Sequence, residues 1–219
     1  MQATETVSIS MPVVVFYISG HGFGHASRQI EIIRQLQRLR NDVHVVIKTP
    51  TPRWFFDVAG LKKFSFETME TDTGVVQTDS LHVDVVRSIK KCDSFHRTLD
   101  QRATSEAVSL KRFDACLIVG DIPPLAFRAG AIAEIPTVAI SNFTWDWIYD
   151  NYPDTASYAP ELVDTLSTAY ASATMAWRFP LHAGFNTCRD IVDVPLVARR
   201  STKDPDKLRD MLGLPRDSP

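Results

Sequence analysis

Hydrophobic residues along the chain alternate between continuous runs and helically spaced repeats. "PVVVFYIS" (12–19) and "NDVHVVIKT" (41–49) are apolar and rich in β-branched residues, which is typical of strands covered on both faces. Between them, "HASRQIEIIRQLQRLR" (25–40) repeats its apolar residues at helical spacing. These segments predict a strand, a crossover helix and a second, parallel strand at the start of the fold.

The same alternation continues along most of the chain, although the polar stretch 70–92 gives no clear pattern. It predicts a doubly wound, mostly parallel, Rossmann-like α/β sheet of about six or seven strands. The further elements expected are a helix over 51–60, a strand over 63–69, a helix over 93–112, a strand over 113–121, a helix after Pro124, a strand over 136–142 and a helix over 159–173.

The composition is that of an ordinary globular protein, with 219 residues, 44% hydrophobic and 23% charged. A formal net charge of -2 with scattered basic residues argues against binding to nucleic acid or an anionic membrane. Three widely spaced cysteines lack the grouping that would hold zinc and indicate a reducing compartment. The first apolar run is too short for a signal peptide or a membrane span, so we expect a cytoplasmic protein.

The chain is expected to contain one main domain. Residues 1–11 are polar and predict a flexible tail, and residues 12–200 hold the alternating pattern of the Rossmann-like domain. Residues 201–219 predict a short helix that stops at Gly213, followed by a proline-flanked linker to a second domain.

The stretch "YISGHGFGHASRQ" (17–29) places three glycines where the first strand enters the first helix, at the edge where doubly wound sheets bind ligands. Gly20, Gly22, Phe23 and Gly24 are therefore candidate substrate-binding residues. The free amides that open the helix favour an anionic group. The alternative is a tight turn that binds nothing.

Neither a dinucleotide nor a cofactor is expected at this turn. Its spacing is G-x-G-x-G, and the second strand ends in Lys48 and Thr49 rather than in the acidic residue that holds a ribose. No G-K-[ST] follows the glycines, so the sequence contains no ATPase motif. His21 and His25 have no third metal ligand nearby, so we expect no metal site.

His21 and His25 are instead candidate catalytic bases, and loop histidines in contact with solvent are the alternative. Asp121 ends a buried strand at the same edge. It could orient a histidine, hold a sugar hydroxyl or cap the next helix. Our prediction is that His25 points across the edge of the sheet towards Asp121.

The segment "SNFTWDWIYD" (141–150) combines aromatic faces with acidic side chains after another strand. Such a mixture suits a sugar ring, and Asn142, Trp145 and Asp146 are candidate substrate-binding residues. The alternative is that the aromatic residues belong to the core.

Three segments, "GHGFGHASR", "GDIPPLAF" and "SNFTWDWIY", resemble the N-terminal region of a GT-B glycosyltransferase-like family. The resemblance is strongest to the glycosyltransferase-like region of arabinokinases and their bacterial relatives. The glycine loop is also similar to that of the peptidoglycan N-acetylglucosaminyltransferase. This similarity implies that His25 corresponds in position to the histidine of that enzyme's loop.

This resemblance implies a single, acceptor-side half of a GT-B architecture, with a second domain or subunit contacting the nucleotide sugar and no essential metal. The implied partners are a nucleotide-sugar donor and a sugar or lipid-linked acceptor. We expect a domain that transfers a sugar to an acceptor hydroxyl and is inactive alone. The alternative is a non-catalytic module that binds a sugar or sugar phosphate, of the kind fused to a sugar kinase.

Overall fold

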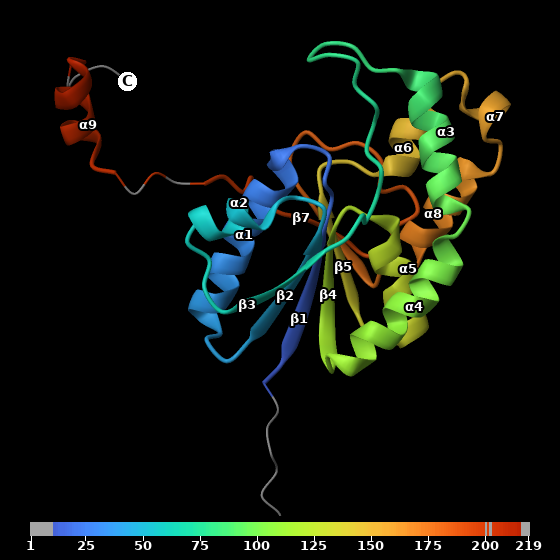
Figure 1. Ribbon diagram of the computed structural model, residues 1–219, viewed down its shortest axis with the longest axis horizontal. Helices are drawn as coiled ribbons and strands as arrows, with labels where there is room; N and C mark the ends of the chain where they lie inside the picture. Colours follow the sequence, from blue (N-terminus) through green and yellow to red (C-terminus); the bar gives the residue numbers. More distant parts are fainter. Residues whose placement is uncertain (1–10, 200, 202, 216–219) are drawn as a thin grey trace, which may run out of the picture.

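The computed structural model describes residues 11–199, 201 and 203–215. In this part of the chain, seven strands form a sheet in the order β3-β2-β1-β4-β5-β6-β7, and every neighbouring pair is parallel (Figure 1). The predicted doubly wound parallel sheet is confirmed. The strands are β1 (Val13–Ile18), β2 (His44–Thr49), β3 (Phe64–Thr68), β4 (Ala115–Asp121), β5 (Thr137–Ser141), β6 (Met175–Arg178) and β7 (Ile191–Asp193).

Helices cover both faces of this sheet, and a separate hydrophobic cluster lies under each layer. One face carries α1 (Phe23–Leu39) and α2 (Arg53–Val58). The opposite face carries α3 (Val85–His96), α4 (Leu99–Arg112), α5 (Pro124–Ala133) and α8 (Leu162–Ala171). Two short helices follow β5: α6 (Trp145–Asp150) packs against α8, and α7 (Thr155–Tyr158) lies against the outer side of α3.

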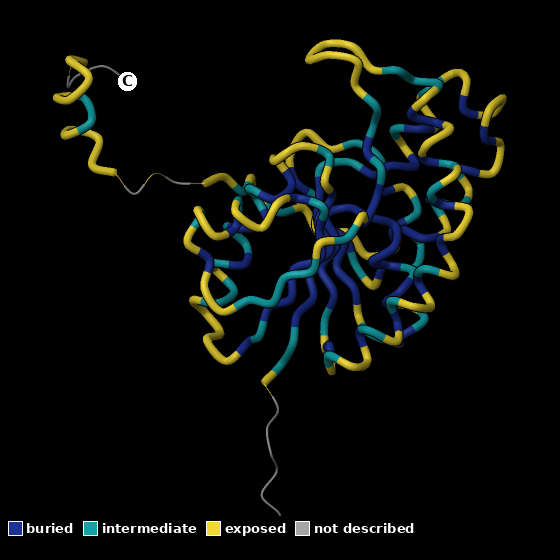
Figure 2. The backbone as a smooth tube through the Cα atoms, viewed as in Figure 1, coloured by how far each residue is buried: buried dark blue, intermediate teal, exposed yellow. Residues whose placement is uncertain are grey.

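Burial on both faces explains the continuous apolar runs. In β1, Val14, Phe16 and Ile18 pack into the α1 cluster, whereas Val15 and Tyr17 pack into the cluster under α4 and α5. Figure 2 shows the same result as a buried central sheet within a half-exposed layer of helices. Each side chain of the strand has an apolar partner, so the sequence does not alternate.

The helix expected over 93–112 was wrong in extent, because two helices occupy this region. The chain turns at Arg97 and Thr98, between α3 and α4. α3 begins earlier than expected, inside the unassigned stretch, where the Asp84 side chain caps it by accepting from the Arg87 amide at 2.9 Å. The apolar spacing continues across the turn through Phe95 and Leu99, and the Arg102 guanidinium covers the Phe95 ring at 3.8 Å.

The C-terminal helix α9 (Pro205–Leu212) begins at an Asp204 cap and ends at Gly213, which has a φ of 65°, as expected for a helix stopped by glycine. None of its residues is buried, and it lies apart from the sheet in Figure 1. The expected tail, except Met11, and the last four residues of the expected linker lie outside the described residues. The domain boundaries stay predictions.

Two further observations concern the whole described chain. None of its helices combines the length and the apolar character needed to cross a bilayer. Cys92, Cys116 and Cys188 are all free thiols.

Candidate functional site

The candidate site lies where the carboxyl ends of β1, β4 and β5 meet the start of α1. Gly22, with a φ of 75°, turns the chain from β1 into α1, a conformation that glycine adopts without strain. The helix then begins at Phe23, so His25 is its third residue and lies inside the first turn rather than before it.

The predicted contact between His25 and Asp121 is present. His25 Nδ1 lies 2.8 Å from Asp121 Oδ1, and both side chains are buried. The N-cap position of α5 is taken by Pro123, and no side chain caps that helix. Asp121 therefore does not cap the next helix, and of the three interpretations of this residue the structure favours the one in which it orients a histidine.

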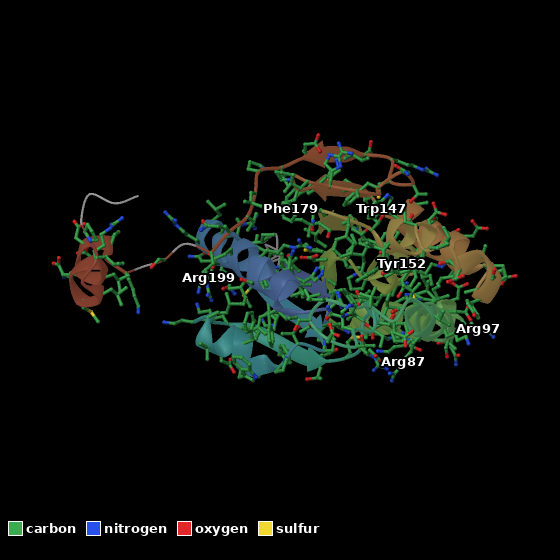
Figure 3. The ribbon with its side chains drawn as sticks, turned by 90° about the horizontal axis from the view of Figure 1, so that it is seen from above. Arg87, Arg97, Trp147, Tyr152, Phe179 and Arg199 are labelled. Atoms are coloured by element: carbon green, nitrogen blue, oxygen red, sulfur yellow. The ribbon has the colours of Figure 1, made fainter. Side chains whose placement is uncertain are left out.

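Arg28, one turn after His25 on α1, links the ends of β4 and β5 through hydrogen bonds. Its Nε donates to Asp121 Oδ2 at 2.5 Å, and its Nη2 donates to Asp121 Oδ1 as well. The same guanidinium donates to Ser141 Oγ at 2.8 Å and to Asn142 Oδ1 at 2.9 Å. It also lies 5.3 Å from the ring centre of Phe179, labelled in Figure 3, which looks down on this edge of the sheet.

Asp121 is a buried carboxylate with all its acceptor positions engaged, because Gln29 Nε2 donates to Oδ2 at 2.7 Å in addition to His25 and Arg28. Burial alone would raise the pKa of Asp121, but the charges and hydrogen bonds of His25 and Arg28 outweigh it and lower that pKa to about 2. Asp121 is thus ionised at neutral pH and can accept a hydrogen bond from a protonated His25 Nδ1, although Arg28 Nη2 also lies 2.9 Å from that nitrogen.

The consequence for His25 concerns its second ring nitrogen. When Nδ1–H donates to Asp121, Nε2 carries the lone pair of the neutral ring. Nε2 has no hydrogen-bond partner among the described residues. The ring is also held in place by an edge contact with Phe143, with ring centres 5.7 Å apart. The cluster therefore presents one oriented acceptor for an incoming hydroxyl.

His21 occupies a different environment in the same loop. Burial and the charge of His25 lower its pKa. Its ring lies edge-on to Trp145, with centres 5.6 Å apart, and rests against the backbone of Gly74, where a Cβ would come within 2.6 Å of His21 Nδ1. No side-chain hydrogen bond of His21 is found within the described residues. Of the two histidines, only His25 is oriented by a carboxylate.

A second buried carboxylate, Asp72, lies beside the cluster and was missed by the sequence analysis. It accepts from Ser19 Oγ at 3.0 Å and from Trp145 Nε1 at 2.9 Å. Burial raises the pKa of Asp72, against the opposing effect of the Ser19 hydroxyl and the charge of His25. The residue lies in the polar stretch that showed no periodicity, so nothing in the local pattern could have revealed it.

The residues of the aromatic and acidic segment 141–150 lie in different environments. Trp145 is 3% exposed, belongs to the core cluster and contacts His21, whereas Trp147 is 37% exposed and lies on the surface (Figure 3). The carboxylate of Asp146 is turned towards α8, where it accepts from Ser167 Oγ at 2.9 Å. The structure thus brings Asn142 and Trp145 to the cluster but leaves Asp146 outside it.

The glycine loop leaves the start of α1 open. Gly20 is required because a Cβ there would overlap the ring of Pro50, whereas a Cβ on Gly22 or Gly24 would face empty space. Neither an acidic residue nor a side-chain cap occupies the first turn of α1, so its backbone amides face outwards without a partner side chain. Phe23 is 49% exposed and stacks on Phe55 with ring centres 4.8 Å apart.

The described residues contain no group of three or more His, Cys, Asp or Glu side chains placed to hold a metal ion. The polar groups that converge on this edge are an imidazole nitrogen, a guanidinium and backbone amides. Such a set binds hydroxyl and anionic groups.

Comparison with known proteins gives relatives of two kinds, while no family model matches the chain. The chain is 35% identical to L-arabinokinase of Arabidopsis thaliana over 97% of its own length, and it spans 21% of that protein. Among solved structures, it is similar to UGT2 of Phytolacca americana in complex with UDP-2-fluoro-glucose and pterostilbene. That match has a TM-score of 0.57 at 13% identity, and covers 93% of this chain and 57% of the other.

A third match points the same way. UGT89C1 of Arabidopsis thaliana in complex with quercetin has a TM-score of 0.52 at 15% identity, and the match covers 94% of this chain and 56% of the other. At these identities the structural matches establish the fold alone, which is that of part of a GT-B glycosyltransferase. The resemblance expected from the three sequence segments is confirmed, and the chain spans about one fifth of the curated relative that it matches.

Proposed function

We propose that this chain is the acceptor-side half of a GT-B glycosyltransferase, with His25 as the base that activates an acceptor hydroxyl. The observation that carries the proposal is the oriented His25 ring, whose Nδ1 is bonded to an ionised Asp121 at 2.8 Å and whose Nε2 has no partner among the described residues. A histidine held in this way is suited to proton abstraction by its second nitrogen.

In the proposed reaction, the acceptor hydroxyl donates a hydrogen bond to His25 Nε2. As its oxygen forms a bond to the anomeric carbon of the donor sugar, the bond from that carbon to the diphosphate oxygen breaks, and the hydroxyl proton moves to Nε2. Asp121 stabilises the resulting imidazolium. The unpartnered amides of α1 are placed to favour the negative charge that develops on the leaving diphosphate.

The remaining candidate residues divide by position. The glycines of the loop and exposed Phe23 are proposed to contact the substrates, whereas Asn142 acts through Arg28 and the buried Trp145 acts through Asp72. Asp146 is not included, because its carboxylate bonds to Ser167. UDP-2-fluoro-glucose and pterostilbene, which are bound to UGT2 of Phytolacca americana, support a nucleotide-sugar donor and a small-molecule acceptor. The free thiols fit a cytoplasmic location.

A second function is favoured by one feature of the site. Arg28 contacts both oxygens of Asp121, which partly neutralises the carboxylate that would otherwise stabilise an imidazolium. The chain is also similar to a segment of a sugar kinase. A non-catalytic module that binds a sugar or sugar phosphate at the same edge is therefore the alternative.

The test uses the complete protein that carries this chain, incubated with a panel of labelled nucleotide sugars and sugar acceptors. The proposal expects transfer of label to an acceptor, or slow hydrolysis of one donor. Saturable binding of a sugar or sugar phosphate without any turnover would favour the binding module instead. If no donor and no sugar is bound, both functions are contradicted.

A further inference from the structure

The second carboxylate of the site, Asp72, is buried without a cation of its own. Its side chain is 4% exposed, and its two hydrogen bonds come from neutral donors, Ser19 Oγ at 3.0 Å and Trp145 Nε1 at 2.9 Å. Both bonds favour the ionised carboxylate, which accepts hydrogen bonds and donates none. Among the described residues, no lysine, arginine or histidine forms an ion pair with it. Buried carboxylates are ordinarily paired with a cation, so the lone charge of Asp72 requires an explanation.

The end of β1 holds Asp72 next to the candidate site. Thr71 Oγ1 donates to the Ile18 carbonyl oxygen at 3.0 Å, which fixes the loop before Asp72 against this strand. Ser19, the next residue of the chain after β1, donates through its amide to the backbone oxygen of Asp121 at 2.8 Å. Its hydroxyl donates to Asp72. A single residue thus connects the two buried aspartates.

A series of aromatic rings also connects Asp72 with the His25 ring. Trp145, which donates to Asp72, lies edge-on to Phe143 with ring centres 5.0 Å apart. Phe143 in turn lies edge-on to His25, with ring centres 5.7 Å apart. Across this series the two ionisable groups interact, because a positive charge on His25 favours the ionised form of Asp72. Such coupling is reciprocal, so ionised Asp72 favours a proton on His25.

The other ionisable groups around these two residues add no net charge at pH 7. Arg28 and Asp121 form an ion pair with each other. Three further side chains are kept neutral because burial lowers the pKa of a histidine and raises the pKa of a thiol and of a phenol: His21, Cys92 and Tyr170. While His25 is neutral, Asp72 is therefore the carboxylate of this group that no cation balances within the described residues.

We propose that Asp72 is a positioning residue that makes His25 a stronger base, an inference that rests on the proposed function. With His25 neutral, the group carries one net negative charge, and it becomes neutral when the acceptor proton moves to Nε2. Charges interact strongly in a buried site, so this neutralisation favours proton transfer. Asp121 and Arg28 set the orientation of the ring, and Asp72 supplies the negative charge that their ion pair lacks.

Asp72→Asn is the variant that isolates the charge. The asparagine oxygen can accept from Trp145 Nε1 and its amide can donate to Ser19 Oγ, so both contacts are kept while the charge is lost. Glu70→Gln is the matched control, since it removes an exposed carboxylate from the same loop. A residue that only ties the loop together is replaced by asparagine without consequence, whereas a residue that acts through its charge is not.

The test is an NMR titration of the 219-residue chain, followed by the ¹⁵N shifts of the His25 ring. We expect the midpoint of the His25 titration to move to lower pH by about one unit in Asp72→Asn, the lower end for the loss of a nearby opposite charge. Glu70→Gln should leave the midpoint unchanged, because exposed charges are screened. An unchanged midpoint in Asp72→Asn, or equal movement in both variants, would overturn the proposal.

The wild type gives a second measurement that needs no variant. The ¹³Cγ resonance of Asp72 should show an inflection at the pH where the His25 ring titrates, because the two charges interact. A resonance that does not respond to His25, or that belongs to a protonated carboxyl at pH 7, contradicts the proposal even if Asp72→Asn fails to fold.

Turnover separates this inference from the proposed function. In the complete protein, Asp72→Asn should lower kcat by at most about tenfold, the equivalent of one pH unit, with KM little changed. The acid side of the pH–rate profile should move to lower pH. A raised KM with unchanged kcat would contradict the proposal. If the wild type transfers no sugar, the proposed function fails, while the titration still decides whether Asp72 acts on His25.

Discussion

Two clusters of buried charge lie in this molecule, one around Lys48 and one around Asp121. Lys48 Nζ is fully buried and contacts Glu67 at 2.9 Å, Glu106 at 2.8 Å and Ser109 at 3.2 Å, which uses all three of its donors. Tyr17 closes the same cluster by donating to Glu106 at 2.6 Å. The polar hydrogens of Lys48 and Tyr17 are thus all engaged within this cluster.

The Asp121 cluster is as deeply buried but is not closed. Asp121 accepts from His25, Arg28 and Gln29, yet His25 retains a ring nitrogen without a partner among the described residues. It also lies at the carboxyl edge, next to the open start of α1, whereas the Lys48 cluster packs between the sheet and α4. A buried charge by itself does not indicate a functional site, and our proposal rests instead on the unfilled hydrogen-bonding position of His25 beside it.

The comparison predicts the largest loss of stability for Lys48→Met. This change leaves Glu106 and Tyr17 without their cation, and we expect the free energy of unfolding to fall by about 3 kcal/mol, near the lower end for breaking a buried pair because Glu67 is partly exposed. Urea unfolding at pH 7 measures it. Asp193→Asn, in the exposed pair with Arg178, is the control and should change little. A loss for Lys48→Met no greater than that of the control would show that the cluster does not stabilise the fold.

Arg28→Met should have the next largest effect. It removes charge-assisted hydrogen bonds to a buried carboxylate that keeps His25 and Gln29, and we expect a loss of about 2 kcal/mol at pH 7. The folded-state pKa of Asp121, about 2, lies below its ordinary value of 3.8. The stabilisation of the fold by ionised Asp121 is therefore complete above about pH 4 and is lost as the pH falls towards 2.

The pH dependence distinguishes this effect from a simple packing loss. The stability difference between the wild type and Arg28→Met should be constant above about pH 4 and shrink below it, as Asp121 is protonated first in the variant. Arg38→Met, an exposed position on the same helix, is the control. A difference that stays constant down to pH 2.5 would mean that Arg28 acts through packing on Phe179 and not through Asp121.

Trp145→Phe should have the smallest effect of the three. It deletes one hydrogen bond to Asp72 while Ser19 still donates to that carboxylate, so we expect a loss of about 1 kcal/mol in the free energy of unfolding at pH 7. The exposed Trp147→Phe is the matched control on the same short helix. If the two variants are equally stable, the Trp145 indole does not contribute through Asp72.

Much of the fold could be predicted from the sequence because strands buried on both faces keep apolar residues at every position, as in β1. The two strands at the C-terminal end of the sheet do not. All three residues of β7, which lies at the edge, are exposed, and the neighbouring β6 is four residues long with one buried position, so neither produced a recognisable run. The turn between α3 and α4 was missed because the apolar spacing continues across it through Phe95 and Leu99.

The candidate site divides in the same way. His25, Asp121 and Asn142 could be placed together because the carboxyl ends of parallel strands share one edge. The position of Arg28 could not be predicted, since an arginine on an amphipathic helix is ordinarily exposed. Only the fold shows that Arg28 reaches the ends of β4 and β5. Its spacing of three residues from His25 was the one available signal. Asp72 depends on tertiary contacts alone, because no element contains it.

The central claim is that His25, and not His21, carries the reactive nitrogen. The measurement is turnover of sugar transfer by the complete protein, with His25→Ala and His21→Ala compared at matched stability. We predict that His25→Ala lowers turnover by about 10²–10⁴-fold, the usual contribution of a positioned general base. Its folding stability should fall by only about 1–2 kcal/mol, for the lost hydrogen bond to Asp121. His21→Ala, which lacks a carboxylate partner, should affect turnover far less. If His21→Ala abolishes turnover and His25→Ala only unfolds the protein, His25 is a structural residue and the account is contradicted.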